Sequence, residues 1–490
     1  MQAESREDRR PDALAALASV RPALRVVAEA ERLAAFEMDA YIQRRATPMA
    51  AALPDTEAQV VAIVRALARL GVPIVSRGAG TGISGGATPR PDGVMLVLTR
   101  MRRIVAVDAA ARLAVVEPGV PNAQVTEAAA PAGLYFAPDP SSQVVSSIGG
   151  NIAENAGGVH CLKYGLTVHN VVALRAVDGD GDLLEVGGAA LDAPGYDLLA
   201  LLHGSEGNLG VITQATLRLL PRPESTETLL AAFATVKAGA EAVGAIIGAG
   251  VIPAAIEMMD RVVIDACERF MALGLPKAEA LLLVEVDGGA EETAETRARV
   301  EAILAGCGVT EVRVAKDEAE RANLWKSRKG AFAALATVMP DYYTMDGTIP
   351  RRALAEALEE IYALGREYGL VIGNVFHAGD GNMHPCIFYD SAKPGELERS
   401  EELGGRILER CIEHGGTITG EHGVGIEKLR QMCLQFRPGE IAAFHDVKRA
   451  FDPANVLNPG KAVPSLKRCA EWGGMHVRDG RLPRPDIPRF

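Results

Sequence analysis

One stretch decides the fold of this 490-residue chain: "SRGAGTGISGGATPRPDG", residues 76–93. It contains a G-x-G-x-x-G pattern at Gly80, Gly82 and Gly85, which is typical of dinucleotide-binding βαβ units. Those units require a helix to begin inside the glycine loop, whereas two prolines and a strand-like "GVMLVLT" follow here. The stretch therefore predicts a glycine loop between two strands, and not a Rossmann unit. Its backbone N–H groups can still form a nest for pyrophosphate oxygens.

Two further stretches combine glycine with hydrogen-bonding side chains. They are "PDPSSQVVSSIGGNIAENAGG", residues 138–158, and "HGSEGNLGVIT", residues 203–213. Glycine permits close backbone approach, while Ser and Asn offer donors and acceptors. A chain with 51 glycines also has glycine-rich turns for purely structural reasons, and for any single loop that alternative stays open. Three such loops in one half of the chain favour a binding site.

The segments around these loops predict an α+β fold. Residues 56–70 carry apolar side chains at helical spacing, with Asp55 or Thr56 as the cap and Gly71 at the end. In the second half, strand-like and helical segments alternate. The expected strands are 228–236, 253–260, 280–288 and 310–317, and the expected helices are 238–250, 290–308 and 396–414. This order predicts an antiparallel sheet covered by helices on one face, as in ferredoxin-like domains.

Composition excludes some functions. The net charge of −12 and a pI near 5.4 argue against a nucleic-acid partner. No run of about 20 apolar residues is present, so no membrane span is expected. The seven cysteines are widely scattered, which favours reduced thiols and a cytoplasmic location, and no C-x-x-C suggests an iron–sulfur cluster.

Two histidines enclose a predicted turn in "NVFHAGDGNMHPCIF", residues 374–388. Asp380-Gly381 is a favoured central pair for a two-residue hairpin turn. A hairpin centred there places His377 opposite His384 on one face of the sheet, with Cβ atoms roughly 5 Å apart. Two imidazoles at that separation can share a divalent ion. The alternative is an exposed hairpin whose histidines face solvent.

In combination these motifs resemble a known family. "RGAGTGISGGA", "PDPSS", "IGGNIAENAGG", "KYG" and "GSEGNLGVIT" resemble the PCMH-type FAD-binding domain of the vanillyl-alcohol oxidase family. "HAGDGNMHP", "GEHGVG" and "NPGK" resemble the C-terminal domain of FAD-linked 2-hydroxy acid dehydrogenases. Over nearly its full length the chain resembles the FAD-linked subunits of bacterial glycolate oxidases.

The resemblance implies an α+β architecture in four parts. An N-terminal helical segment over residues 1–50 precedes a two-subdomain FAD-binding domain over 51–222. A ferredoxin-like cap or substrate domain with a metal site follows over 223–440, and residues 441–490 return to the flavin.

The resemblance also implies non-covalent FAD, although His160 is a candidate for the covalent attachment seen in some members. The residues expected to bind FAD are Arg77, Gly78, Ala79, Gly80, Thr81, Gly82, Ser84, Gly85, Pro138, Asp139, Ser141, Ser142, Ser147, Gly149, Gly150, Asn151, Asn155, Gly157, Gly158, Glu206, Gly210, Val211, Ile212, Asn458 and Lys461.

For the active site, the resemblance implies one divalent metal held by His377, His384 and Glu421. Zinc suits such ligands, with manganese or iron as alternatives. Asp380 and Asn382 are expected to shape the turn. His422 is the candidate base for the substrate hydroxyl, or else a structural histidine.

Substrate binding is expected at two further residues. Arg328 is the candidate cation for the substrate carboxylate, or else a surface charge beside Lys326 and Lys329. Tyr343 is expected in the pocket wall, with Tyr342 and Thr344 as weaker candidates.

The expected activity is oxidation of glycolate to glyoxylate, with hydride passing from Cα to flavin N5. D-lactate or another D-2-hydroxy acid is the alternative substrate on the same site. A flavin-bearing scaffold and a lyase on the same fold are the alternatives of other classes. The implied partners are a smaller FAD-domain subunit and an iron–sulfur subunit that pass electrons to quinone, which would attach the complex peripherally to the inner membrane. A homodimer stays open.

Overall fold

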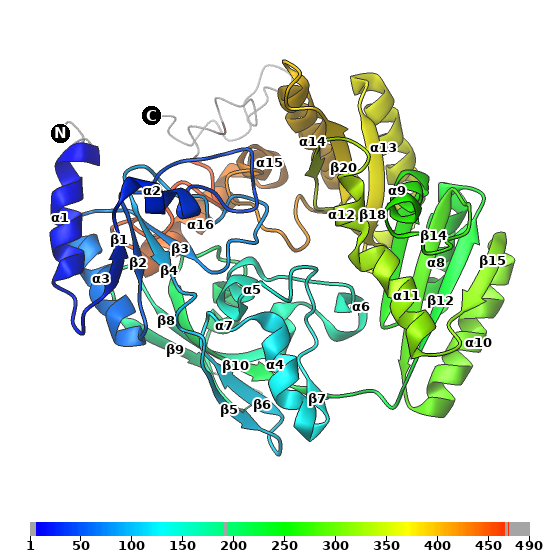
Figure 1. Cartoon of the computed structure of the whole chain (residues 1–490), viewed down its shortest axis with the longest axis horizontal. Coiled ribbons are helices and arrows are strands. Elements are labelled where there is room, and N and C mark those ends of the chain that lie inside the picture. Colours follow the sequence, from blue (N-terminus) through cyan, green and yellow to red (C-terminus); the bar gives the residue numbers. More distant parts are fainter. Residues whose placement is uncertain (1–5, 191–193, 466–468, 470–490) are drawn as a thin grey trace. The chain divides into compact units, whose positions relative to one another are not determined.

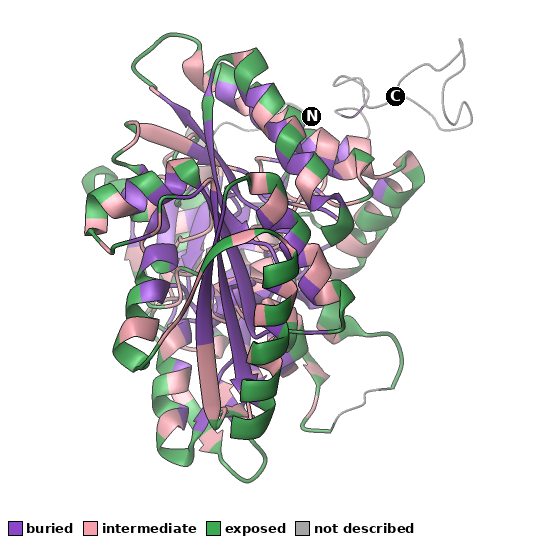
Figure 2. Ribbon diagram, turned by 90° about the vertical axis from the view of Figure 1, so that its right-hand side faces the viewer, coloured by how far each residue is buried: buried purple, intermediate pink, exposed green. Residues whose placement is uncertain are grey.

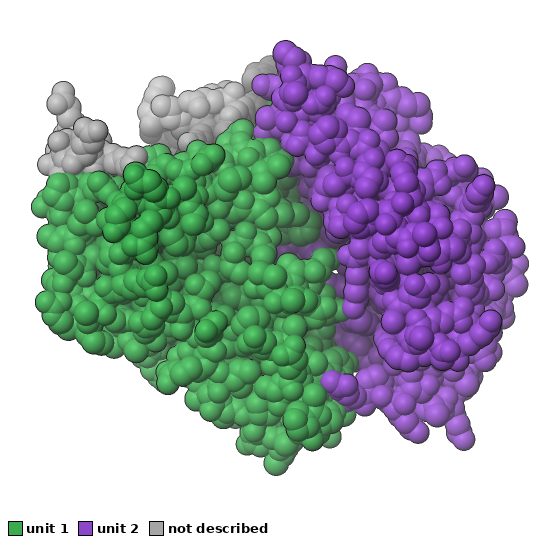
Figure 3. All heavy atoms as spheres, in the orientation of Figure 1, with its two compact units in different colours: residues 1–156, 166–221, 422–490 green, residues 157–165, 222–421 purple. Residues whose placement is uncertain are grey.

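The structure, a computed structural model, describes residues 6–190, 194–465 and 469 (Figure 1). These residues form two compact units, which Figure 3 colours separately. The first unit comprises residues 1–156, 166–221 and 422–490, and the second comprises residues 157–165 and 222–421. Each unit is therefore built from segments that are far apart in the sequence.

The first unit contains a four-stranded sheet in the order β1-β2-β4-β3. Its strands are β1 (Arg25–Val27), β2 (Ala50–Leu53), β3 (Ile74–Arg77) and β4 (Val94–Val97). The predicted helix is confirmed as α3 (Glu57–Arg69), and the Thr56 side chain caps it by accepting a hydrogen bond from Gln59 N. The apolar stripe of α3 is buried against the sheet, and α1 (Arg6–Ala18) packs beside α3.

The glycine loop leaves β3 and returns to β4 without an intervening helix. The two strands run parallel, with Arg77 aligned to Val97. This confirms that the loop is not part of a Rossmann unit.

A second, five-stranded sheet of the first unit is antiparallel, in the order β5-β6-β10-β8-β9. Its strands are β5 (Ile104–Asp108), β6 (Leu113–Val116), β8 (Val171–Val177), β9 (Leu183–Gly187) and β10 (Val211–Arg218). Apolar residues of α4 (Asn122–Ala129) and α5 (Ile148–Glu154) join its core. The two-residue strands β7 (Leu134–Tyr135) and β11 (Leu220–Pro221) pair with each other. The remaining elements of this unit are α2 (Ala30–Leu33), η1 (Ala34–Phe36), η2 (Ala130–Ala132), η3 (Thr167–Asn170), α7 (Leu198–Leu202), α15 (Leu429–Gln435) and α16 (Pro438–Phe451).

The C-terminal part of the chain returns to the first sheet. Ile74 N donates to Val456 O at 2.7 Å, and Asn458 N donates to Ile74 O at 2.7 Å. Cys433 and Cys469 form a disulfide with a Cα–Cα distance of 5.3 Å. The expectation of uniformly reduced cysteines is therefore wrong for this pair, because folding joins two residues that lie 36 positions apart in the sequence.

The second unit is built on a nine-stranded sheet in the order β15-β12-β14-β13-β18-β19-β17, with β20 pairing β18 and β16 pairing β20. Its strands are β12 (Ser225–Phe233), β13 (Ala255–Asp260), β14 (Ala280–Gly288), β15 (Val309–Val314), β16 (Asp341–Thr344), β17 (Gly347–Thr348), β18 (Val371–His377), β19 (Asn382–Met383) and β20 (Pro385–Tyr389). All recorded pairings are antiparallel, as predicted.

Helices cover both faces of this sheet, and the expectation of one covered face is wrong. On one face Leu230 and Leu281 pack with residues of α9 (Arg261–Met271) and α12 (Ala331–Leu335). On the other, a Cβ at Gly239 of α8 would lie 3.6 Å from Phe233. Figure 2 shows the long strands buried beneath helices with exposed outer surfaces. The helices of this unit are α6 (Cys161–Tyr164), α8 (Val236–Gly248), α9 (Arg261–Met271), α10 (Ala290–Gly306), α11 (Glu318–Lys329), α12 (Ala331–Leu335), η4 (Arg351–Ala353), α13 (Leu354–Tyr368) and α14 (Glu396–Glu413).

The histidine hairpin forms, but its register differs from the prediction by two residues. His377 pairs with Asn382, and Asn374 pairs with Pro385. The turn therefore has four residues, 378–381, and only Gly381 has a positive φ, at +83°. Because side chains alternate with a period of two, an even shift keeps both histidines on one face.

Candidate active site

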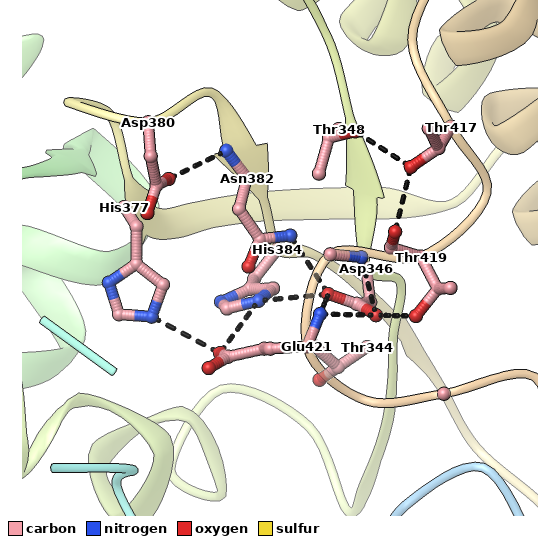
Figure 4. Close-up of polar contacts among 12 residues, drawn as sticks. Thr344, Asp346, Thr348, His377, Asp380, Asn382, His384, Thr417, Thr419 and Glu421 are labelled. Carbon is pink, nitrogen blue, oxygen red and sulfur yellow. Dashed lines mark hydrogen bonds and ion pairs between the residues drawn. The ribbon is translucent and has the colours of Figure 1, made fainter. Parts of the chain in front are cut away.

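Three candidate metal ligands meet in the second unit (Figure 4). His377 ends β18, His384 lies between β19 and β20, and Glu421 lies in the loop that follows α14. Glu421 Oε1 is 3.2 Å from His377 Nε2 and 3.4 Å from His384 Nε2. The imidazole rings stand nearly perpendicular, with centroids 5.1 Å apart. Both histidines are buried, so the solvent-exposed alternative is wrong.

The charges around His377 fit a divalent cation. Burial by itself would lower the pKa of His377, but Glu257 and Glu421 raise it well above its usual value. The pocket thus favours positive charge at the point where the ring faces Glu421. Two imidazole nitrogens and one carboxylate oxygen are ligands that zinc accepts, with coordination positions left for other molecules.

Asp346 holds the Glu421 loop against the hairpin, and sequence reasoning missed it. Its buried carboxylate accepts hydrogen bonds from Asn382 Nδ2 at 2.8 Å and from Thr419 Oγ1 at 2.5 Å. It also accepts from the backbone N–H of Glu421 at 3.2 Å, and its Oδ1 lies 3.5 Å from His384 Nε2. Asn382 N in turn donates to Asp380 Oδ1 at 3.0 Å, which fits the expected turn-shaping role of both residues.

Arg328 is a buried residue at the end of α11, so the surface-charge alternative is wrong. Its side chain is 1% exposed, whereas Lys326 and Lys329 are exposed. Arg328 Nε donates to Glu257 Oε2 at 2.5 Å. Its Nη2 is buried and has no hydrogen-bond partner among the described residues. A buried guanidinium nitrogen in that state fits an anion such as a carboxylate.

The remaining predicted active-site residues are two tyrosines and a threonine of β16, and His422. Tyr343 is buried in β16, where it pairs with Ile387 of β20. Tyr342 is half-buried and donates to Phe332 O at 3.3 Å, and Thr344 Oγ1 lies 3.4 Å from Cys386 Sγ. His422 directly follows Glu421 in the chain and is the first residue of the last segment of the first unit.

In the first unit, the glycine loops that were predicted to bind a cofactor converge. A Cβ at Gly78 would lie 2.2 Å from Ser147 Oγ and 3.8 Å from Gly150 Cα. This close approach favours glycine, because any Cβ would displace the Ser147 hydroxyl, and it joins the 76–93 loop to the start of α5. Asn151 is tied to the same region, since its Oδ1 accepts from Asn122 Nδ2, which also donates to Pro138 O.

The C-terminal segment completes this region. Asn458 Nδ2 donates to Gly86 O at 3.0 Å and to Glu206 O at 2.7 Å. Lys461 Nζ donates to Gly86 O at 2.7 Å, and burial lowers the Lys461 pKa to about 7. The structure therefore brings together predicted residues from three distant segments.

Several buried polar atoms here fit a polar ligand such as FAD. Within the described residues they have no hydrogen-bond partner, although buried polar groups are normally paired. They are Ser76 Oγ, Ser84 Oγ, Ser146 Oγ, Glu154 Oε2 and Asn458 Oδ1. FAD carries hydroxyl, phosphate and ring groups that can pair with such atoms.

Two carboxylates lie in the same region. Glu206, which was predicted, accepts from Val424 N at 2.7 Å and from Gly425 N at 2.6 Å. Glu154, which was not predicted, would lie 2.7 Å from a Cβ at Gly86. Burial raises the pKa of both groups, and for Glu154 the neighbouring Glu206 raises it further.

The remaining predicted FAD residues have the following positions in the structure. Val211 and Ile212 of β10 are buried in the cores of the first unit. Gly157 and Gly158 belong to the second unit, as does His160, whose Nε2 lies 3.2 Å from Glu285 Oε1. The others are in the first unit. Ser141 is exposed and Ser142 is half-buried, and both lie in the turn after Pro138 and Asp139. Gly149 lies within α5, and Asn155 follows its last residue. Gly210 precedes β10, and Arg77, Ala79, Gly80, Thr81, Gly82 and Gly85 lie at the end of β3 and in the glycine loop.

Comparisons with known proteins identify the family of this chain. Residues 48–187 match the FAD binding domain family, and residues 222–462 match the C-terminal domain of FAD linked oxidases. Glycolate oxidase subunit GlcD of Escherichia coli is 53% identical over 98% of this chain and 97% of that protein. A D-lactate dehydrogenase of Archaeoglobus fulgidus is 34% identical over 84% of this chain and 91% of that protein.

A solved structure shares the fold. 4-Ethylphenol oxidase from Gulosibacter chungangensis superposes with a TM-score of 0.79, covering 95% of this chain and 99% of that one at 18% identity. Among the described residues, no helix combines the length and apolar character needed to cross a membrane. The chain therefore belongs to the FAD-linked oxidase family and is an FAD-dependent oxidoreductase.

Proposed function

We propose that the chain oxidises glycolate to glyoxylate as an FAD- and divalent-metal-dependent 2-hydroxy acid dehydrogenase. The observation that carries this proposal is the cluster formed by the buried His377 and His384 with the half-buried Glu421. Glu257 links this cluster to Arg328. The arrangement combines a ligand set for a metal with a cation for a carboxylate, and a 2-hydroxy acid presents the matching hydroxyl and carboxylate oxygens. The relative named glycolate oxidase subunit supports glycolate as the substrate.

Each proposed group has a distinct task. The metal, held by His377, His384 and Glu421, supplies a Lewis acid that lowers the pKa of the substrate hydroxyl. Arg328 holds the substrate carboxylate through its terminal nitrogens. His422 accepts the hydroxyl proton, a role that suits an imidazole near neutral pH.

The first unit binds the redox cofactor in this proposal. The glycine loop of residues 77–86, the start of α5, Glu206, Asn458 and Lys461 hold FAD without a covalent link. FAD supplies the acceptor for the hydride that leaves the substrate Cα. The buried unpaired oxygens of Ser84, Glu154 and Asn458 support this placement.

D-Lactate is the second candidate substrate, and the D-lactate dehydrogenase relative favours it. The test is anaerobic bleaching of the bound flavin by glycolate, D-lactate, L-lactate and D-2-hydroxyglutarate, before and after chelation. We expect bleaching by glycolate that chelation abolishes. Strong bleaching by D-lactate with little by glycolate would favour the second candidate. If no 2-hydroxy acid bleaches a flavin-loaded chain co-expressed with its partner subunits, the proposal fails.

We also propose that reoxidation requires a smaller FAD-domain subunit and an iron–sulfur subunit that deliver electrons to quinone. The name of the 53% identical relative, which describes a subunit, supports an assembly. The isolated chain should reduce an artificial dye slowly with glycolate, and adding the partners should raise the rate. Full turnover by the isolated chain would contradict the requirement.

A further inference from the structure

Glu257 connects the metal ligand His377 to Arg328. It lies on β13 directly opposite His377 of β18, so the strand register sets this contact. Its carboxylate is 1% exposed, and each oxygen has one main partner. Oε1 is 2.8 Å from His377 Nδ1, and Oε2 is 2.5 Å from Arg328 Nε.

We propose that Glu257 is a positioning residue that orients both the metal ligand His377 and Arg328, the residue that binds the substrate carboxylate. This inference rests on the function proposed above. An ionised carboxylate only accepts hydrogen bonds, so Glu257 requires the hydrogen of His377 on Nδ1. In the neutral ring, the form that can bind a metal, the lone pair of His377 then lies on Nε2, the nitrogen that faces Glu421. A hydrogen bond of this kind also fixes the ring orientation of a metal-binding histidine.

The second oxygen of Glu257 sets the orientation of Arg328. Because the guanidinium is planar, a hydrogen bond from Nε fixes the directions of its terminal N–H groups. Nη2 stays buried without a partner among the described residues, and the Phe332 ring lies 6.0 Å from the guanidinium carbon. Glu257 also compensates the buried charge of Arg328, which would otherwise be costly. The Glu257 carboxylate thus links the metal affinity of His377 to the binding of the substrate carboxylate by Arg328.

A purely structural ion pair is the competing explanation, and Glu285 provides a matched control for it. Glu285, on the adjacent strand β14, is 2% exposed and likewise bonds to an arginine and a histidine, Arg321 and His160. Its other partners are Trp325 and Thr228, and none of the four is a proposed metal ligand. Glu285→Gln therefore removes a comparable buried charge without touching the proposed metal site.

The test measures zinc affinity of the FAD-loaded full chain by competition with a chromogenic chelator, without substrate. Glu257→Gln keeps the side-chain shape, but its NH₂ group faces either His377 Nδ1–H or Arg328 Nε–H. We expect zinc affinity to fall about 10- to 100-fold in Glu257→Gln and to change less than about 2-fold in Glu285→Gln. At saturating zinc, the glycolate concentration for half-maximal bleaching should also rise in Glu257→Gln alone.

The outcomes separate this inference from the proposed function. Wild-type zinc affinity in Glu257→Gln would overturn the inference and leave the proposed function intact. Equal losses in both variants would assign Glu257 a structural role and also overturn it. A wild-type chain that binds no zinc, manganese or iron would overturn the proposed function and the inference with it. If Glu257→Gln does not fold, Glu257→Asp serves, since its shorter carboxylate cannot reach both partners and should show the same loss.

Discussion

At the scale of single residues, Arg328 gives the most direct test of substrate binding. Arg328→Lys keeps the positive charge but loses the planar fork and the buried Nη2. We expect the glycolate concentration for half-maximal bleaching to rise at least about tenfold, equivalent to about 1.4 kcal/mol. Lys329→Met, at the exposed neighbouring position, is the control and should behave like wild type. An unchanged glycolate response in Arg328→Lys would remove Arg328 from the substrate site.

Glu154 gives a pH test at the same scale. Its pKa is raised by burial and by Glu206, so the folded chain binds this proton more tightly than the unfolded chain. Stability therefore falls as pH rises from the unfolded pKa near 4.5 towards the raised folded pKa. In urea unfolding of the flavin-free chain, Glu154→Gln should lack this loss and gain up to about 1.4 kcal/mol per pH unit over wild type across that window. A pH-independent difference would contradict the raised pKa.

The residues that sequence reasoning missed share one physical property. Glu257 and Asp346 are buried carboxylates whose hydrogen-bond partners come from distant parts of the chain, and Glu154, whose Oε2 is buried, lies close to Gly86 of the glycine loop. The histidine pair could be predicted because a short hairpin joins it. The partners of Glu257 lie 71 and 120 positions away, and only strand pairing and helix packing bring them close. The available signal was the acidic Glu257 inside the apolar stretch "AAIEMM", since a buried charge requires a partner.

At the scale of elements, the hairpin turn can be tested through Gly381. Its φ is +83°, and an added Cβ would lie 2.2 Å from Ile349 O. Gly395 has a similar φ of +79° with nothing within 4 Å, so Gly395→Ala measures the cost of the positive φ alone. We expect Gly381→Ala to lower the free energy of unfolding by about 1–3 kcal/mol more than Gly395→Ala, and to weaken zinc binding as well. Equal effects of the two substitutions would show that the turn adapts.

The positions of helices and strands along the sequence were more predictable than which sheet faces the helices cover or the register of the histidine hairpin. The strand-helix-strand order follows from periodicity, and α8, α10 and α14 appear close to their predicted ranges. The sequence did indicate that helices cover both faces of the sheet. "TLLAAF" and "ALLLVEV" are nearly continuous apolar runs, which are typical of strands buried on both faces. The hairpin register had no such signal, since turns of two and four residues place the histidines on the same face.

At the scale of the whole molecule, the disulfide ties residue 469 to α15. Non-reducing peptide mapping should show one linked pair containing Cys433 and Cys469. Cys433→Ser should lower the free energy of unfolding by about 2–4 kcal/mol, since the crosslink closes a long loop. Cys307→Ser, at a cysteine outside this pair, is the control. Recovery of both cysteines as thiols from protein purified without reductant would contradict the pairing.

The division into two units predicts that metal and flavin bind independently. The proposed metal ligands belong to the second unit, whereas nearly all proposed FAD residues belong to the first. Chelation followed by gel filtration should therefore remove the metal and leave the ratio of flavin to protein unchanged. Conversely, Asn458→Leu, which removes the hydrogen bonds to Gly86 and Glu206, should lower FAD content without changing zinc affinity. Release of flavin on chelation, or loss of zinc binding together with the flavin, would contradict independent binding.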